Sequence, residues 1–406
     1  MSEQTFVIVG ASLAGAKAAE ELRERGFDGR LVLIGSETER PYERPPLSKD
    51  YLQGKSERET AYVHEAGFYD DKDIELRTGT TVEAIDPGAG RVTLEGGEEL
   101  AFDRLLLTTG SAVRPLDVPG ADLDGVHYLR TLPDSDALRE RIRQGGQVAV
   151  IGSGWIGSEV AASARQLGAE VTIIDMVKLP NEKVFGREVG EFYRDVHASH
   201  GVRLLLGQGV QALEGDGSVR RVRTSEGNTV DCDFVAVGVG VVPRTGLGER
   251  AGLDVDGGML VDERLRTSAE NVFAAGDVVN HLHPFFGRRI HVEHWANALN
   301  QGPAAARAML GESAAYERLP YFFSDQYDVG MEYSGEASDS DEVVIRGSRE
   351  DGEFIAFWLA GGRVVAGMNV NVWDVTEPIQ ALIHSRRQID RDKLADPDTP
   401  LESLTD

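Results

Sequence analysis

Residues 147–157 read Gln147-Val-Ala-Val-Ile-Gly-Ser-Gly-Trp-Ile-Gly157. The apolar run predicts a buried parallel strand, and the residues after it predict a helix over about 156–167 that ends at Gly168. A second run, Glu170-Val-Thr-Ile-Ile-Asp175, completes a strand–helix–strand unit. Glycines spaced as G-x-G-x-x-G between a strand and a helix are the dinucleotide-binding fingerprint. Asp175 is placed to accept hydrogen bonds from ribose hydroxyls and to repel a 2′-phosphate, which favours NADH over NADPH.

An earlier unit of the same kind begins with the strand Phe6-Val-Ile-Val9, and its turn reads Gly10-Ala-Ser-Leu-Ala-Gly15. Ser12 stands where the fingerprint has its middle glycine, so the motif is weakened but recognisable. A helix over 14–25 and a strand over 30–34 follow, and Glu37 comes just after that strand, where an acid binds ribose. Two such units far apart in the chain predict an α/β fold with two Rossmann-like dinucleotide-binding domains.

Composition excludes several classes of protein. The 406 residues carry 42 Lys and Arg against 68 Asp and Glu, a net charge of −26, which argues against nucleic acid and anionic membrane surfaces as partners. Cys232 is the single cysteine, so the chain has no internal disulfide and no cysteine-ligated cluster. No apolar run reaches the length of a membrane span and no signal peptide is evident, so we expect a cytoplasmic protein.

The last quarter of the sequence differs from the rest and predicts a C-terminal α+β domain. Three antiparallel strands are expected at 343–346, 354–359 and 363–368, followed by a helix over 379–387. The acidic residues 392–406 are expected to be mobile. Trp358 and Trp373 are expected in the core of this domain, and Cys232 is expected to be a small buried hydrophobe. The histidines at 281, 283, 291 and 294 are expected to pack rather than to bind metal.

Several segments resemble motifs of flavoproteins that bind two dinucleotides. Leu105-Leu-Leu-Thr-Thr-Gly-Ser111 is similar to their joint between FAD and NAD domains, and Asn271-Val-Phe-Ala-Ala-Gly-Asp-Val278, with Thr267 before it, is similar to their second FAD motif. Arg40-Pro-Tyr-Glu-Arg-Pro-Pro-Leu-Ser-Lys49 and Pro320-Tyr-Phe-Phe-Ser-Asp-Gln326 resemble segments of oxygenase-coupled ferredoxin reductases. The chain is identified as a member of that family, which includes putidaredoxin reductase and biphenyl dioxygenase reductase, with a glutathione-reductase-like architecture.

The resemblance implies domain boundaries and site residues. It implies an FAD-binding domain at 1–112 and 246–320, an NAD-binding domain at 113–245 and a C-terminal domain at 321–406. It implies that Lys49 lies near flavin N5 and pairs with Glu159, a carboxylate near nicotinamide. The residues implied to contact FAD are Gly10, Ser12, Ala14, Gly15, Glu37, Arg44, Pro45, Lys49, Val82, Thr109, Gly110, Arg130, Gly276, Asp277, Glu293, His294, Trp295 and Phe323. Those expected at NADH are Gly152, Gly154, Trp155, Ile156, Gly157, Glu159, Asp175 and Gly238. Phe323 departs from the family, whose members often have tryptophan there.

The single cysteine bears on where the electrons go. Related disulfide reductases pass electrons from flavin to a cysteine pair, which this chain lacks. We therefore expect an NADH-dependent FAD reductase whose partner is a two-iron ferredoxin that serves a haem monooxygenase or a Rieske dioxygenase. Two alternatives stay open: an NADH-responsive flavoprotein resembling apoptosis-inducing factor, and a reductase of small organic acceptors. An acidic ferredoxin needs a basic docking patch, for which the candidates are Arg288, Arg289, Arg307, Arg386 and Arg387. A monomer and a homodimer are both compatible with the sequence.

Overall fold

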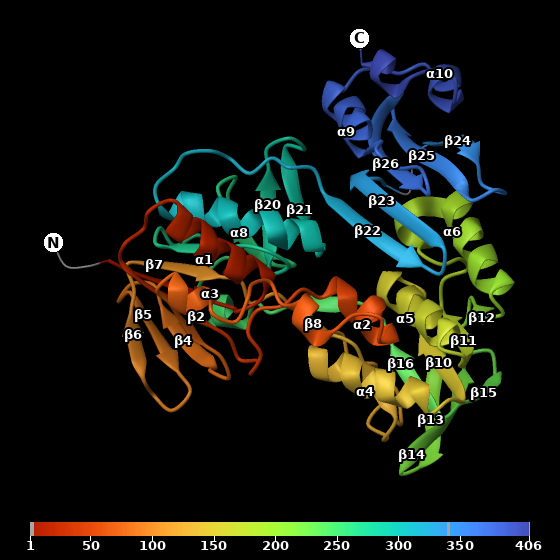
Figure 1. Cartoon of the computed structure of the whole chain (residues 1–406), viewed down its shortest axis with the longest axis horizontal. Helices are drawn as coiled ribbons and strands as arrows, with labels where there is room; N and C mark the ends of the chain where they lie inside the picture. The colour runs from red at the N-terminus through yellow and green to blue at the C-terminus, as the bar shows by residue number, and fades with distance from the viewer. Residues whose placement is uncertain (1–3, 339–341, 406) are drawn as a thin grey trace. The chain divides into compact units, whose positions relative to one another are not determined.

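The structure is a computed structural model that describes residues 4–338 and 342–405. The chain forms two compact units, each assembled from segments that are distant in sequence (Figure 1). The first unit consists of Met1–Arg44, Arg58–Ala112 and Val241–Pro320. The second consists of Pro45–Glu57, Val113–Gly240 and Tyr321–Asp406. The segment that carries Lys49 therefore belongs to the second unit, although its neighbours in sequence belong to the first.

A five-stranded parallel sheet forms the centre of the first unit. Its strand order is β19 (Val272–Ala274), β7 (Arg104–Leu107), β1 (Thr5–Val9), β2 (Arg30–Ile34) and β3 (Ile74–Arg77). The apolar runs of β1, β2 and β7 are buried, as expected for parallel strands covered on both faces. Helices α1 (Leu13–Glu24) and α8 (Trp295–Met309) lie side by side (Figure 1). A Cβ at Gly302 would lie 2.2 Å from the Ala14 carbonyl oxygen, so glycine permits this close packing.

Smaller elements complete the first unit. They are the sheet of β4 (Val82–Asp86), β5 (Arg91–Leu94) and β6 (Glu99–Ala101), the sheet of β18 (Met259–Val261), β20 (Val279–His283) and β21 (Arg288–His291), the pair β8 (Ser111–Val113) and β17 (Val241–Pro243), and the short helices η2 (Arg58–Ala61), α3 (Phe68–Asp71) and α7 (Gly246–Arg250).

A second parallel sheet organises the second unit. Its order is β12 (Arg203–Leu206), β11 (Glu170–Asp175), β10 (Gln147–Ile151), β16 (Phe234–Val237) and β9 (Val126–Tyr128). The accompanying elements are α4 (Leu132–Arg143), α5 (Trp155–Gln166), α6 (Glu182–Ser199), the sheet of β13 (Val210–Asp216), β14 (Ser218–Thr224) and β15 (Thr229–Asp231), and the short η1 (Pro45–Ser48) and α2 (Asp50–Gln53). Two Rossmann-like sheets confirm the predicted fold class.

The C-terminal sheet has five antiparallel strands, of which the three predicted ones are confirmed and the first two were not predicted. Its order is β22 (Tyr321–Gln326), β23 (Val329–Gly335), β26 (Arg363–Val370), β25 (Glu353–Ala360) and β24 (Glu342–Ser348). The first two strands lack a clear apolar alternation. The buried residues of β22 are Phe322, Ser324 and Gln326, two of which are polar.

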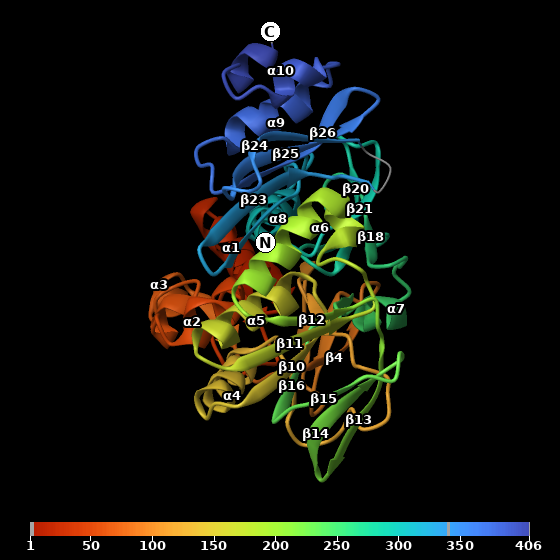
Figure 2. The same cartoon turned by 90° about the vertical axis from the view of Figure 1, so that its right-hand side faces the viewer.

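The helix predicted over 379–387 is confirmed as α9 (Thr376–Ser385), which begins three residues earlier, ends two residues earlier and packs on β23 and β26 (Figure 2). Two further predictions for this region were wrong. The tail predicted to be mobile forms α10 (Arg391–Ala395) and η3 (Leu401–Leu404), with Leu394 and Leu401 buried. The Arg346 guanidinium fixes it by donating to the carbonyls of residues 394, 396, 397 and 399. Trp373 is 54% exposed, whereas Trp358 is buried as predicted.

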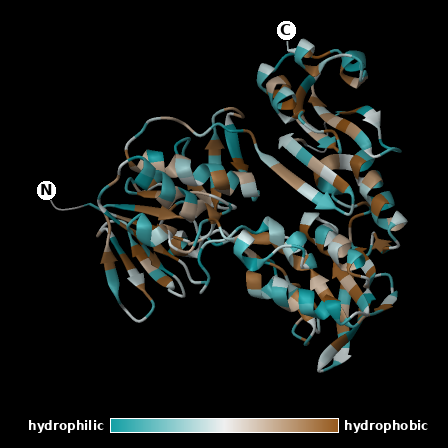
Figure 3. Cartoon of the chain, viewed as in Figure 1, coloured by the Kyte–Doolittle hydropathy of each residue, from teal (hydrophilic) through white to brown (hydrophobic). Residues whose placement is uncertain are grey.

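The pattern of hydropathy agrees with this division into sheets and covering helices. Figure 3 shows hydrophobic colour along the strands of both parallel sheets and of the C-terminal sheet. Cys232 is buried as expected, and this burial raises the pKa of its thiol to about 12. None of the helices in the described ranges is both long and apolar enough to cross a bilayer.

Candidate active site and nucleotide-binding turns

The turn between β1 and α1 is built on two glycines that no other residue could replace without movement. Gly10 has φ +122°, and a Cβ on it would lie 2.1 Å from the Thr108 carbonyl oxygen. A Cβ on Gly15 would lie 2.1 Å from the Gly10 carbonyl oxygen. Ser12 is the N-cap of α1, with extended backbone and no capping hydrogen bond from its side chain. The first N–H groups of α1 are thus left for another acceptor, and the pyrophosphate of FAD fits that role.

The turn between β10 and α5 repeats this geometry. Gly152 has φ +101°, and a Cβ on it would lie 2.3 Å from the Gly238 carbonyl oxygen. A Cβ on Gly157 would lie 2.2 Å from the Gly152 carbonyl oxygen. A Cβ on Gly154, the N-cap of α5, would meet nothing within 4 Å. The middle glycine therefore opens space over the helix N-terminus, which fits a bound dinucleotide pyrophosphate.

An acidic residue stands near the end of the second strand of each strand–helix–strand motif: Glu37 follows β2, and Asp175 is the last residue of β11. Glu37 accepts a hydrogen bond from Arg44 at 2.9 Å and another from the Tyr42 hydroxyl. Asp175 accepts from the Ser153 N–H at 2.5 Å and from the Ser153 hydroxyl at 2.8 Å. Both carboxylates are therefore held in place at the position where such acids bind ribose hydroxyls.

Lys49 and Glu159 form an ion pair inside the second unit. The Lys49 ammonium lies 2.8 Å from Glu159 Oε2, and the side chains are 13% and 3% exposed. The Ser48 hydroxyl donates to the same oxygen at 2.5 Å, and the Ser324 hydroxyl donates to Glu159 Oε1 at 2.7 Å. Lys49 Nζ also lies 5.4 Å from the centre of the Phe323 ring. Three donors thus fix a nearly buried carboxylate, which in turn fixes one ammonium group.

Serine side chains fasten the Lys49 segment to two helices of the same unit. Ser163 Oγ of α5 donates to the Ser48 carbonyl at 2.7 Å, and Ser135 Oγ of α4 donates to the Leu47 carbonyl at 2.8 Å. Ser163 is four residues after Glu159, so both face the segment from one side of α5. The ion pair is consequently set by a rigid local frame.

The other predicted residues are distributed between the units. The first unit contains Ala14 in α1, Val82 at the start of β4, Thr109 and Gly110 after β7, Gly276 and Asp277 after β19, and Glu293, His294 and Trp295 at the start of α8. The second unit contains Pro45 in η1, Arg130 before α4, Trp155 and Ile156 in α5 and Gly238 after β16. Trp155 packs against Phe185 and Phe322, with ring centres 5.2 Å away in each case.

The second FAD motif is stabilised by polar contacts of the first unit. The Gly276 N–H donates to Gln301 Oε1 at 2.9 Å. His291 is hydrogen-bonded to the Val279 carbonyl at 2.8 Å and to Glu293 Oε1 at 3.0 Å, and the hydrogen bond to Glu293 raises the pKa of the imidazole. Neutral imidazole can donate from only one nitrogen, so the two acceptors favour the charged form.

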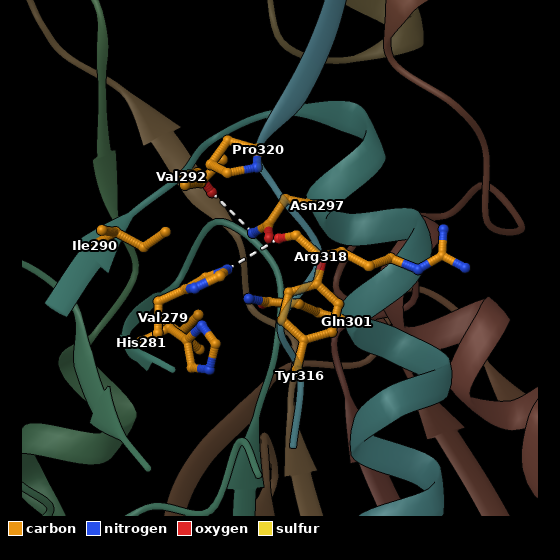
Figure 4. A pocket seen from close by; sticks show the side chains of 10 residues that line it. Val279, His281, Ile290, Val292, Asn297, Gln301, Tyr316, Arg318 and Pro320 are labelled. Carbon is orange, nitrogen blue, oxygen red and sulfur yellow. Dashed lines mark hydrogen bonds between the residues drawn. The ribbon is translucent and has the colours of Figure 1, made fainter. Parts of the chain in front are cut away.

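Two of the four histidines that were predicted to pack, His281 and His283, line a small pocket in the first unit (Figure 4). His281 is 1% exposed, and burial lowers its pKa to about 4. His283 Nε2 is bonded to the Arg318 carbonyl at 2.9 Å, and Asn297 donates to the Val292 carbonyl at 3.0 Å. His281 is therefore neutral at physiological pH and belongs to the packing behind the second FAD motif.

The five arginines predicted for docking differ in their surroundings. Arg288 and Arg289 are exposed on β21, and Arg289 donates to the carbonyls of Val261 and Asn280. Arg307 forms an ion pair with Glu21 at 2.9 Å. Arg386 and Arg387 are exposed after α9 in the second unit.

Sequence reasoning missed four residues that support these sites, namely Ser48, Ser324, Ser153 and Tyr42. Ser48 and Tyr42 both lie in the sequence motif 40–49 quoted above, so that motif could have suggested a role for them. Ser324 has a weaker signal, a polar residue at an inward position of a strand. Its partner Glu159 is 165 residues away, a contact that only the folded chain reveals.

Comparison with known proteins places these features in context. A family model described as pyridine nucleotide-disulphide oxidoreductase matches residues 4–302, and one described as reductase C-terminal matches residues 321–405. The ferredoxin–NAD(+) reductase component of the anthranilate 1,2-dioxygenase system of Burkholderia cepacia is 41% identical over 411 residues, which cover 100% of each chain.

Two solved structures are similar over nearly the whole chain. Putidaredoxin reductase, in its covalent complex with putidaredoxin, has a TM-score of 0.95 at 34% identity, covering 99% of this chain and 98% of that one. A ferredoxin reductase from Rhodopseudomonas palustris has a TM-score of 0.96 at 34% identity, covering 99% and 100%.

Proposed function

We propose that this chain, which belongs to the pyridine nucleotide-disulphide oxidoreductase family, passes electrons from NADH through FAD to a two-iron ferredoxin serving an oxygenase. FAD and NADH are its cofactors. The relative from Burkholderia cepacia is named for this activity in a dioxygenase system, and the similar solved complex joins a reductase to its ferredoxin partner. A cytoplasmic location, the compartment where NADH is produced, is part of the same proposal.

The single cysteine is the observation that carries the choice of acceptor. The family takes its name from a disulfide, but this sequence has only Cys232. That thiol is buried, and burial raises its pKa to about 12, so it is a poor nucleophile. Electrons therefore have no internal dithiol to enter, and an external acceptor must collect them.

The two glycine turns and the Lys49–Glu159 ion pair have different roles in the proposed reaction. FAD, when bound, accepts a hydride from NADH and returns electrons one at a time. The amides of the Gly10–Gly15 turn would hold the FAD pyrophosphate, and those of the Gly152–Gly157 turn would hold the NADH pyrophosphate. The Lys49 ammonium, which Glu159 holds in place, would supply a positive charge and a hydrogen-bond donor. One NADH and two oxidised ferredoxins then give NAD⁺, two reduced ferredoxins and one proton.

Several finer assignments belong to this proposal. They are the roles given above to individual site residues and the domain boundaries 1–112, 113–245, 246–320 and 321–406. Exposure keeps four of the candidate docking arginines, namely Arg288, Arg289, Arg386 and Arg387, whereas Arg307 is already paired with Glu21. The preference for NADH over NADPH rests on Asp175.

Rapid mixing of the FAD-loaded protein with NADH under anaerobic conditions tests the proposal. Flavin absorbance should bleach quickly with NADH and more slowly with NADPH, and a two-iron ferredoxin should then restore it. Glu159→Gln keeps the size of the side chain but removes its charge, so bleaching should slow by about a hundredfold. Arg187→Gln, at an exposed helix position whose ion pair in the described part of the chain is with Glu191, is the matched control and should leave the rate unchanged. Failure of wild-type flavin to bleach would refute the proposal.

A further inference from the structure

Ser324 connects the C-terminal sheet to the Lys49–Glu159 pair. It lies in the middle of β22, within the segment matched by the reductase C-terminal model, and its side chain is fully buried. Its hydroxyl donates to Glu159 Oε1 at 2.7 Å. All three residues belong to the second unit, so the contact is internal to one compact body.

The hydrogen-bond donors around Ser324 determine the direction of this contact. Gln326 Nε2 donates to Ser324 Oγ at 3.3 Å. An amide NH₂ group can only donate, so Ser324 must accept from it, and the hydroxyl proton is left for Glu159. Residues 324 and 326 share the inward face of β22, which explains why polar side chains occupy positions that the sheet would otherwise fill with apolar ones.

The two oxygens of Glu159 consequently have separate tasks. Oε1 is held by Ser324, while Oε2 receives Lys49 at 2.8 Å and Ser48 at 2.5 Å. With Oε1 fixed, the carboxylate cannot rotate away from Lys49. Without that hydroxyl, the buried Oε1 would lose its only direct donor among the described residues, and the carboxylate would be held through Oε2 alone, about which it could turn.

We propose that Ser324 is a positioning residue for hydride transfer, through which the C-terminal domain sets the Lys49–Glu159 pair. This inference rests on the proposed function, since the pair is assigned to the step between NADH and FAD. It gives the C-terminal domain a part in the reaction with NADH, in addition to any contact with ferredoxin.

The test compares Ser324→Ala with Ser334→Ala in the FAD-loaded protein. Ser334 is a matched control because it is also buried in the C-terminal sheet and accepts a hydrogen bond from a glutamine amide, Gln380 Nε2, at 3.0 Å. Rapid mixing with NADH separates the limiting rate of bleaching from the dissociation constant of NADH. Ser324→Ala should lower the limiting rate about tenfold and change the dissociation constant less than twofold. Ser334→Ala should change neither.

A second measurement does not depend on turnover. Acetylation of Lys49, followed by mass spectrometry and normalised to the exposed Lys393, reports how often the amine leaves its partner. It should rise several-fold in Ser324→Ala and in Glu159→Gln, but not in Ser334→Ala. Equal behaviour of the two serine variants in bleaching and labelling would overturn the inference. If wild-type flavin did not bleach with NADH, the proposed function would fail, while the labelling result would still decide whether Ser324 positions the pair.

Discussion

The two nucleotide-binding turns of this molecule have the same backbone but different middle residues. The outer glycines are equivalent: a Cβ on Gly10 or Gly152 would lie 2.1 or 2.3 Å from a carbonyl oxygen of the neighbouring strand–loop junction. The middle positions are Ser12 and Gly154, and both have extended backbone that any residue can adopt. The fold therefore requires the outer glycines of both turns. At the middle position the fold accepts either residue, and a glycine there, as in Gly154, only gives a bound dinucleotide more room.

The largest effect should come from adding a methyl group at the first glycine of either turn. Gly10→Ala and Gly152→Ala should each destabilise the protein by about 3–5 kcal/mol, because strain at positive φ adds to a collision with backbone. Denaturant unfolding and FAD content measure this. Gly26→Ala and Gly168→Ala are matched controls, since both glycines have positive φ but open space around the Cβ position. These controls should lose only about 1 kcal/mol. Equal losses at all four positions would show that close packing is not the reason for the outer glycines.

A smaller effect, on binding alone, should follow from exchanging the middle residues. Gly154→Ser should weaken NAD⁺ binding about tenfold, equivalent to about 1.4 kcal/mol, because the side chain enters the open space over α5. Its unfolding should change by less than about 0.5 kcal/mol, since φ is −71°. Ser12→Gly in the first turn should leave unfolding equally unaffected. Titration calorimetry with NAD⁺ measures the first effect, and unaltered affinity in Gly154→Ser would place the ligand elsewhere.

The acids after the two turns should differ in what they control. Asp175→Asn keeps an oxygen to accept from Ser153 but removes the charge that repels a 2′-phosphate. The ratio of kcat/KM for NADH to that for NADPH should fall about fivefold, which is about 1 kcal/mol. Glu37→Gln, the equivalent change after the first turn, should lower FAD retention and leave this ratio unchanged. A shift in coenzyme preference from Glu37→Gln would contradict the assignment of the first turn to FAD.

The turns were predictable from the sequence because local chemistry determines them. The four residues before Gly10 and the four before Gly152 are all apolar, as buried parallel strands require, and the glycines mark the turns directly. The family motifs were equally local. Lys49 and Glu159 were paired only through the resemblance, since 110 residues separate them.

The errors share one physical origin, namely structure that depends on tertiary contacts. Strand β22 was missed because its inward positions hold Ser324 and Gln326, which serve a polar network instead of an apolar core. The acidic tail was expected to be mobile, but Arg346 gathers four of its carbonyls. Trp373 was expected in the core, but its ring lies over Gly330, where a Cβ would come within 2.6 Å of it. In each case the contact that decides the structure joins residues more than 40 apart in sequence: Ser324 with Glu159, Arg346 with the tail and Trp373 with Gly330.

The smallest predicted effect concerns the dependence of stability on pH, which should differ between the NADH side and the FAD side of the protein. Asp175 is held by backbone and serine donors that do not titrate, whereas Glu293 on the FAD side is bonded to His291. That hydrogen bond raises the pKa of His291 in the folded protein. The stability that the charged imidazole contributes is therefore fully present below the unfolded pKa of about 6.5, and it is lost as the pH rises through the folded pKa. The side chains of His291 and Glu293 are 26% and 30% exposed, so screening by solvent limits the contribution of their pairing to stability to less than about 1 kcal/mol. His291→Gln should therefore be less stable than wild type at pH 5.5 and equally stable at pH 9 in denaturant unfolding. For Asp175→Asn, the difference in unfolding free energy from wild type should be the same at both pH values. If His291→Gln also differed from wild type by a constant amount at both pH values, packing and not charge would explain the role of His291.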